Sequence, residues 1–259
     1  MLTLGLAGQD PGDWHQAFPP FRIAGNLYYV GTDGLASYLI TTAEGHILIN
    51  ASYERDVPLI RAAVEKLGFQ FRDVKILLTS HAHADHAAGT RLVKDLTAAK
   101  VMVMAGDDVV VRKGEPGWKP CPVDRVLKDG DVVKLGGATL TAHLTPGHTK
   151  GATTWTFPVT EGANSYSVLI VSSLTINHPQ GLAHNRAYPE IVQDYERAYR
   201  TLHGLRCDIF LAPHGEQFGM RAKVARMKDG ANPFVNPAEF GRYLGDQEKI
   251  FRARLAAGN

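Results

Sequence analysis

The chain has 259 residues, of which 44% are apolar and 8% aromatic, a composition typical of an ordinary folded core. Its 28 basic and 26 acidic residues give a formal net charge of only +2, without long runs of like charge. This balance gives no support to a nucleic-acid partner or a charged membrane partner, and no stretch approaches transmembrane length. Because no Ser/Gly/Pro-rich linker divides the sequence, we expect one domain over residues 1–259.

The N-terminus and the two cysteines leave alternatives open. Gly5 and Ala7 resemble the small-residue end of a secretory leader, but a basic start and a full apolar segment are lacking. Residues 1–20 are therefore either the remnant of a trimmed signal peptide or an N-terminal extension. Cys121 and Cys207 are predicted to be unrelated structural thiols, and a disulfide between them is the alternative.

Strand-forming residues dominate the beginning of the chain and predict an opening antiparallel sheet. Expected strands cover residues 26–30, 37–40 and 46–50, with Glu44-Gly45 as a hairpin turn. Apolar residues at helical spacing then predict a helix over 57–67, ended by Gly68. A short apolar run over 74–78 predicts a buried strand, which leads into a His-rich loop.

The rest of the chain repeats this mixture of strands and helices. Expected strands are 101–104, 132–135, 138–144, 153–157, 166–172 and 209–212, and expected helices are 88–98, 107–111 and 191–205. Two mixed blocks without a linker between them predict an α/β fold in which two sheets pack face to face with helices outside, in four layers.

The His-rich loop carries four candidate metal ligands within six residues: His81, His83, Asp85 and His86. Imidazole nitrogens and carboxylate oxygens bind Zn²⁺, and loops at strand ends can present such groups together. In an extended loop His81, His83 and Asp85 alternate toward one side while His86 turns to another, which indicates two ions. A solvated loop that binds metal only weakly is the alternative interpretation.

Two further histidines, His148 and His214, occupy Gly/Pro-marked turns at the ends of predicted strands. Because such turns can converge on one sheet edge, both are candidate ligands. His143 is expected to pack within its strand or to support the site. The histidines expected at the surface or as caps are His15, His46, His184 and His203.

Taken together, His81-Ala-His83-Ala-Asp85-His86, Thr-Pro-Gly-His148 and Pro-His214-Gly resemble the metallo-β-lactamase superfamily, from about Phe21 to about Gly219. The resemblance implies the metallo-β-lactamase fold, an αββα sandwich with a binuclear zinc site along the shared sheet edge. Thioesterases, lactonases, nucleases and β-lactamases of this superfamily share the motif, so the motif alone does not select an activity.

An absence distinguishes among these activities. Between Gly162 and Pro189 the sequence has no Asp, Glu or Cys, and Ser172 and Ser173 stand where relatives carry a metal-bridging Asp or a Cys. The pattern resembles the third subclass of metallo-β-lactamases. That resemblance implies one zinc on His81, His83 and His148 and a second on Asp85, His86 and His214.

The implied function is a zinc-dependent β-lactamase that opens the lactam amide through a hydroxide bridging two zinc ions, with Asp85 as the catalytic residue that orients it. Ser173 and Thr175 would bind the antibiotic's carboxylate, with Ser172 replacing Ser173 if the register is shifted by one. The other interpretation is that these hydroxyls only form hydrogen bonds with nearby backbone groups. A lactonase or glyoxalase-II-like thioesterase, using His178 or water in place of the missing carboxylate, is the alternative function.

The resemblance also implies a small-molecule substrate and a periplasmic or secreted location. Residues 14–18, which include Trp14, are expected either to line the rim of the site or to pack in the core.

Overall fold

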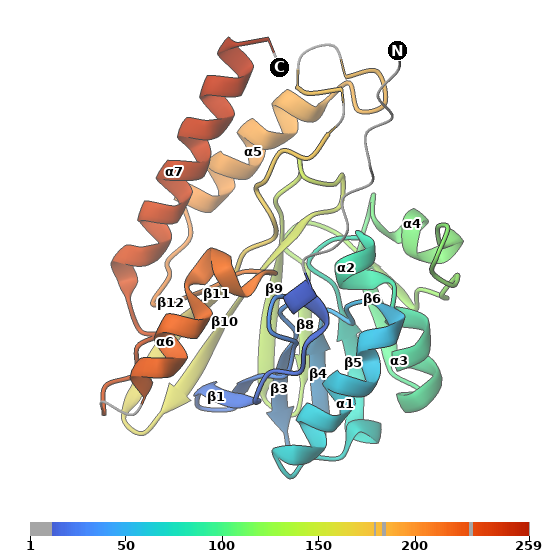
Figure 1. Cartoon of the computed structure of the whole chain (residues 1–259), viewed down its shortest axis with the longest axis vertical. Coiled ribbons are helices and arrows are strands. Elements are labelled where there is room, and N and C mark those ends of the chain that lie inside the picture. Colours follow the sequence, from blue (N-terminus) through green and yellow to red (C-terminus); the bar gives the residue numbers. More distant parts are fainter. Residues whose placement is uncertain (1–11, 179, 183–184, 228–229, 259) are drawn as a thin grey trace.

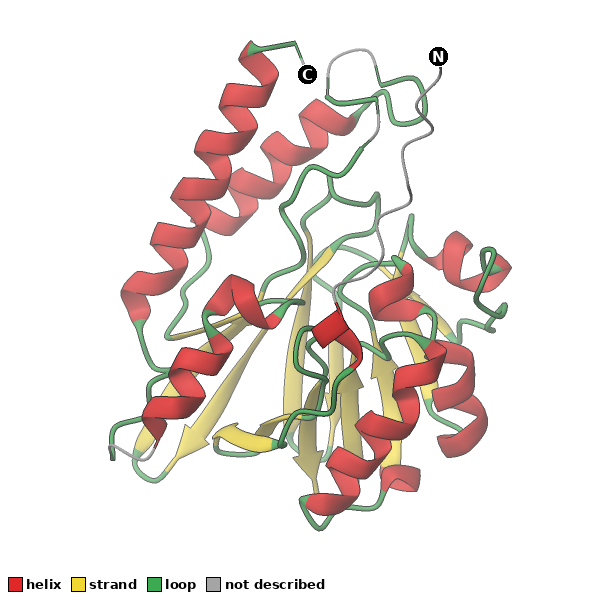
Figure 2. Cartoon of the chain, viewed as in Figure 1, coloured by secondary structure: helices red, strands yellow, loops and turns green. Residues whose placement is uncertain are grey.

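In a computed structural model of the chain, two β-sheets lie in the centre and helices lie on both sides (Figures 1 and 2). The structure describes residues 12–178, 180–182, 185–227 and 230–258. The expectations for residues 1–7 and for His184 fall outside these ranges. The predicted four-layer αββα sandwich is confirmed.

The first sheet has seven strands in the order β1-β2-β3-β4-β5-β6-β7. Its strands are β1 Phe21–Ala24, β2 Leu27–Tyr29, β3 Tyr38–Thr42, β4 Gly45–Ile49, β5 Val74–Leu78, β6 Lys100–Met104 and β7 Arg125–Leu127. Strands β1 to β4 pair antiparallel, as expected, and β4 to β7 pair parallel.

The second sheet has five strands in the order β12-β11-β10-β9-β8. Its strands are β8 Val132–Leu135, β9 Ala138–Leu144, β10 Thr153–Glu161, β11 Asn164–Ile170 and β12 Ile209–Leu211. Because β10 is antiparallel to both β9 and β11, and β11 is parallel to β12, strands β9, β11 and β12 run in one direction. Their carboxyl ends therefore meet at the same sheet edge.

The helices flank the sheets on both sides. The α-helices are α1 Val57–Lys66, α2 Ala84–Ala87, α3 Thr90–Thr97, α4 Asp108–Lys113, α5 Ile191–His203, α6 Met220–Arg226 and α7 Pro237–Ala256. The 3₁₀ helices are η1 Gly12–His15, η2 Glu54–Asp56, η3 Phe71–Asp73 and η4 Gly215–Phe218. Figure 1 shows α5 and α7 side by side beyond the second sheet, and α1 and α3 beside the first.

Two apolar cores follow from the alternation of side chains along the central strands. In β4, Ile47 and Ile49 belong to the core between the sheets, whereas Leu48 packs under the helices on the outer face. Strand β5 repeats this pattern with Leu78 inward and Leu77 outward. Because successive residues of a strand point to opposite faces, such strands are apolar throughout, as a sheet buried on both sides requires.

The expected helix over 88–98 is wrong in its start. The chain forms a short helix, α2, inside the His-rich loop and begins α3 only at Thr90. Gly89 lies between them, and its N–H donates to the carbonyl of Ser52 instead of continuing α2. The His-rich segment is therefore partly helical rather than extended.

Among the described residues, the helices include none with the length and apolar character needed to cross a membrane.

Candidate metal centre

The segment that follows β4 anchors the loop from Thr79 to Ala87 through hydrogen bonds. The side-chain oxygen of Asn50 accepts a hydrogen bond from the N–H of Ser80 at 2.8 Å, and the N–H of Ala51 donates to the carbonyl of His86 at 2.9 Å. Asn50 has φ of 68°, a left-handed conformation that Asn tolerates better than most residues. No sequence pattern singles out Asn50, which is expected only as the last residue of a strand.

Asp85 lies in a short helix and not in the extended loop that the sequence predicted. The turn of α2 begins at Ala84, so Asp85 and His86 are successive residues of a helix rather than alternate residues of a strand. The carboxylate Oδ2 of Asp85 is 3.0 Å from His86 Nε2 and 3.4 Å from His214 Nε2. Asp85 therefore contacts His86 and His214, and ligand atoms of His81, Asp85 and His86 also lie within 4.8 Å of one another. The expected proximity of Asp85 to His81 is thus found, whereas the expected alternation of Asp85 and His86 is wrong, because both lie in α2.

Three histidines form the first group of candidate ligands. Ligand atoms of His81, His83 and His148 all lie within 4.8 Å of one another. The ring centroids of His81 and His83 are each 4.6 Å from that of His148. His81 and His148 are buried, whereas His83 is partly exposed, so the group lies at the floor of the site.

The second group consists of Asp85, His86 and His214. Besides the two carboxylate contacts, the Nε2 atoms of His86 and His214 are 3.2 Å apart. With Zn–N distances of roughly 2.0–2.1 Å, ligands at the corners of a tetrahedron are about 3.3 Å apart. Three ligand atoms at this spacing fit one zinc ion.

The titration behaviour of the groups also suits a metal. Burial, reinforced by the neighbouring His83, lowers the pKa of His148 to about 3, and burial together with His86 lowers that of His214 to about 3. Burial alone would raise the pKa of Asp85, but the charge and hydrogen bond of His86 hold it well below its usual value. A neutral imidazole at His148 and at His214 and an ionised carboxylate at Asp85, the forms that bind metal, therefore prevail near neutral pH.

His148 is oriented by the chain that leaves β11. Its Nδ1 contacts the carbonyl oxygen of Thr175 at 2.7 Å, so the opposite ring nitrogen is available to the first group. The hydroxyl of Tyr195 donates to the same carbonyl at 2.8 Å. A Cβ added at Gly147, whose φ is 127°, would lie 2.6 Å from the ring of Tyr195, so this turn requires glycine.

The three candidate substrate-binding hydroxyls follow β11 but differ in exposure. Ser172 is fully buried, and its Oγ donates to the carbonyl of Ser80 at 3.1 Å and lies 3.4 Å from His81 Nδ1. Ser173 is also buried and bonds the hydroxyl of Thr175 at 2.9 Å. Thr175 is partly exposed, so its hydroxyl is the one of the three with access to solvent. His178 contacts the carbonyl of Gly147 at 2.9 Å.

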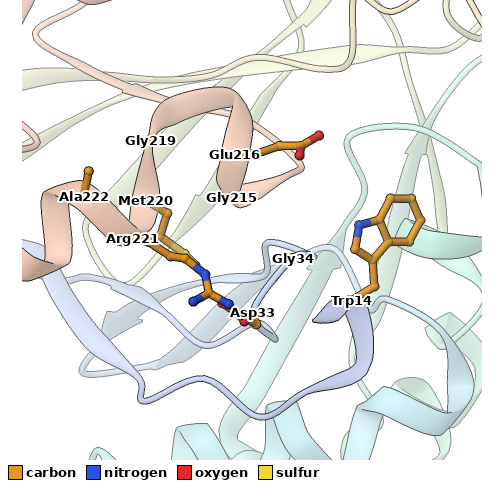
Figure 3. Close-up of a pocket in the computed structure, with 9 residues that line it drawn as sticks. All are labelled: Trp14, Asp33, Gly34, Gly215, Glu216, Gly219, Met220, Arg221 and Ala222. Atoms are coloured by element: carbon orange, nitrogen blue, oxygen red, sulfur yellow. Dashed lines mark hydrogen bonds and ion pairs between the residues drawn. The ribbon is translucent and has the colours of Figure 1, made fainter. Parts of the chain in front are cut away.

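Trp14 belongs to the wall of the site. Its ring centroid is 4.9 Å from that of His214, which places the N-terminal segment beside the second group. Trp14 also borders a cavity of about 420 Å³, in which Arg221 reaches from α6 toward Asp33 on the opposite side (Figure 3). The rim interpretation of residues 14–18 therefore applies to Trp14, whereas Phe18 packs against the core.

His143, His46 and the two cysteines belong to neither ligand group. His143 bonds the hydroxyl of Thr156 on the neighbouring strand at 2.7 Å, as expected of a packed residue. His46 is buried against Phe69, so its expected surface position is wrong. Cys121 and Cys207 are both buried and free.

Comparison with curated proteins finds hydroxyacylglutathione hydrolases. The enzyme of Hyphomonas neptunium is 35% identical over 108 residues, which are 42% of this chain and 38% of that enzyme. The chain thus spans about four tenths of the length of this relative.

Solved structures give longer matches. The native FEZ-1 metallo-β-lactamase from Legionella gormanii is 46% identical with a TM-score of 0.91, over 94% of this chain and 97% of that one. The class B3 di-zinc metallo-β-lactamase LRA-12 from an Alaskan soil metagenome is 35% identical with a TM-score of 0.89, over 96% of this chain and 98% of that one.

The family model described as the metallo-beta-lactamase superfamily matches residues 30–214, which include every candidate ligand. Members of this family are zinc-dependent hydrolases, in agreement with the clustered histidines and Asp85 of this site. The fold, the family model and the matches to solved structures agree, and the chain belongs to the metallo-β-lactamase superfamily, as an enzyme whose structural neighbours are subclass B3 metallo-β-lactamases.

Proposed function

We propose that the protein is a zinc-dependent β-lactamase, which hydrolyses the lactam amide of β-lactam antibiotics. The observation that carries the proposal is the composition of the second group, in which Asp85, His86 and His214 meet without a further carboxylate or thiol from the described part of the chain. Ser172, which by the resemblance stands where relatives carry a bridging carboxylate or a Cys, lies 3.4 Å from His81 Nδ1. The match to FEZ-1 over nearly its whole length supports the same substrate class.

The proposed reaction gives the residues of the site different roles. His81, His83 and His148 would hold one zinc ion, and Asp85, His86 and His214 a second. Bound zinc supplies Lewis acidity and lowers the pKa of water to near neutrality. Asp85 stays ionised and accepts the hydrogen bond that orients the attacking water. Thr175, with Ser173 behind it, donates a hydrogen bond to the substrate's carboxylate.

A thioesterase acting on a hydroxyacylglutathione is the second candidate, because the curated relatives carry that name. His178, beside the turn of His148, would stand in for the missing carboxylate. A lactonase belongs to the same alternative, since its substrate is also an activated acyl group.

A substrate panel with zinc titration separates these functions. We expect protein refilled with zinc to hold about two ions per chain and to hydrolyse nitrocefin and a carbapenem. Chelation should abolish hydrolysis and added zinc should restore it. Zinc-loaded protein that leaves penicillins, cephalosporins and carbapenems intact but cleaves S-lactoylglutathione or a lactone would contradict the proposal and support the alternative.

Two further assignments accompany the proposed activity. A periplasmic or secreted location would place the enzyme between the antibiotic and its targets in the cell wall. The single domain over residues 1–259 also stays a prediction, for which limited proteolysis of the zinc-loaded protein is the direct measurement.

A further inference from the structure

A buried carboxylate that the proposed reaction does not use connects the two loops of the first ligand group. Asp107 precedes α4 and is only 2% exposed. An Asp in this position commonly caps its own helix, but the side chain of Asp107 makes no such bond. Instead it points toward the His-rich loop and the turn of His148.

The contacts of Asp107 are three short hydrogen bonds. Oδ2 accepts from the N–H of Ala82 at 2.7 Å and from the hydroxyl of Thr149 at 2.8 Å, and Oδ1 accepts from the N–H of Gly151 at 2.8 Å. Ala82 lies between His81 and His83, and Thr149 directly follows His148. One side chain therefore fixes the distance between the two segments that supply the first group.

Two observations show that this contact is built into the fold. A Cβ added at Gly151 would lie 2.5 Å from the backbone nitrogen of Asp107 and 2.7 Å from its Cβ, so glycine is needed for the close approach. The carboxylate is surrounded by donors, which favours its ionised form, although burial raises the pKa of Asp107.

The second group has anchors of its own, although Asp85 and His86 share the His-rich loop with Ala82. The carbonyl of His86 accepts from the N–H of Ala51, His214 forms an isolated bridge with Leu35, and the N–H of Ala36 donates to the carbonyl of Pro213. None of the hydrogen bonds of Asp107 given above reaches this segment. A change at Asp107 should therefore act on the three-histidine group and spare the other.

We propose that Asp107 is a positioning residue, which holds His148 at binding distance from His81 and His83 and so sets the zinc affinity of the first group. The inference rests on the zinc ligands assigned under the proposed function. It predicts that the two ions respond unequally to one buried substitution.

The test is Asp107→Asn, with Asp108→Asn as the matched control. In Asp107→Asn an NH₂ group replaces one oxygen and faces a donor of Ala82, Thr149 or Gly151. Asp108 is the neighbouring residue, and its carboxylate accepts from the N–H of Gly106 and pairs with Arg112 rather than with Ala82, Thr149 or Gly151.

The measurement is zinc competition against a chromophoric chelator, starting from metal-free protein. His148→Ala and His214→Ala identify which binding step belongs to which group. We expect Asp107→Asn to weaken the step that His148→Ala removes by roughly 10–100-fold, as loss of a supporting contact to a metal ligand does, and to leave the other step unchanged. At saturating zinc, the kcat of Asp107→Asn should return toward that of the unmodified protein.

Several results would overturn the inference: equal zinc affinities in Asp107→Asn and unmodified protein, equal weakening of both steps, or the same weakening in Asp108→Asn. If Asp107→Asn fails to fold, Thr149→Val is the variant to test, because it removes one hydrogen-bond donor and keeps the carboxylate of Asp107. If zinc binding to the three-histidine group is unchanged in Thr149→Val, the inference is also overturned. Unmodified protein that binds no zinc refutes the proposed function and this inference together, whereas normal zinc binding without a selective effect refutes only the inference.

Discussion

At the scale of single residues, His148 and His143 provide a direct comparison, because both belong to the end of β9 and the turn that follows it. Only His148 reaches the first ligand group. His148→Ala should lower hydrolysis by more than about 100-fold, since even residues that merely support a ligand account for 10–100-fold, and should reduce the zinc content. Steady-state kinetics with nitrocefin and metal analysis of the dialysed protein measure both quantities.

His143→Ala is the control for that substitution. Its ring bonds Thr156 across the strand pair, so its loss should cost about 1 kcal/mol of stability and leave zinc content unchanged. Activity that survives in His148→Ala, or zinc loss in His143→Ala, would show that the ligands are wrongly assigned.

The sequence predicted the candidate ligands because each histidine follows an apolar strand or a Gly/Pro turn. It did not predict the contacts that hold them. Asn50 and Asp107 act through backbone groups of segments far away in sequence, and short-range patterns contain no information on such contacts. The prediction for His46 is wrong because a histidine directly after the Glu44-Gly45 turn does not reveal that Phe69 covers it.

At the scale of elements, the junction between α2 and α3 depends on Gly89. An added Cβ would lie 2.4 Å from the carbonyl oxygen of Ala51 and 2.6 Å from a methyl group of Val57. Gly89→Ala should therefore lower the free energy of unfolding by about 1–3 kcal/mol, as overpacking does. Denaturant unfolding of the metal-free protein measures the change.

Gly241→Ala is the matched control within α7. A Cβ there meets no atom within 4 Å, and alanine is favoured over glycine in a helix by about 0.8–1 kcal/mol. This variant should be more stable than the unmodified protein. If both substitutions shift stability in the same direction, the packing at Gly89 does not decide its conformation.

The elements that the sequence did not predict share weak apolar patterns. Helix α7 buries only Phe240, Leu244 and Phe251 among its 20 residues and contains two glycines, so its helical periodicity is faint. Strands β1 and β7 are 4 and 3 residues long and each contains an arginine, so neither forms a continuous apolar run. By contrast, β5 was predicted in its correct bounds because four of its five residues are apolar.

At the scale of the whole molecule, strand direction assembles the site. Strands β9, β11 and β12 end at one edge, where β5 of the other sheet also delivers its loop. The N–H of Thr153 donates to the carbonyl of Ser80, and Trp155 Nε1 donates to the carbonyl of Thr79, so the two sheets are joined where the ligands meet. The sequence predicted convergence at strand ends, but strand order comes from pairing between distant segments.

The buried imidazoles make the stability of the metal-free protein depend on pH. The pKa values of His148 and His214 are lowered to about 3 by burial and by neighbouring imidazoles, whereas an unfolded histidine has a pKa of about 6.5. Between these values the unfolded chain binds more protons than the folded chain, so stability rises with pH and falls as pH decreases below about 6.5. The lowered pKa of Asp85 acts in the same direction at lower pH.

We therefore expect the free energy of unfolding of the metal-free protein to fall between pH 6 and pH 5, by roughly 1.4 kcal/mol per pH unit for each buried histidine. Denaturant unfolding at a series of pH values measures this slope. His148→Ala removes one of these histidines. The free energy of unfolding of this variant should therefore depend less steeply on pH, by the equivalent of about one bound proton. Zinc should shift the decrease to lower pH at a given concentration, because bound metal stabilises the folded state and competes with protons for the same nitrogens. A free energy of unfolding that is constant over this range, or that increases as pH falls, would contradict the prediction. It would mean that these imidazoles are protonated in the folded protein and therefore repel a metal ion.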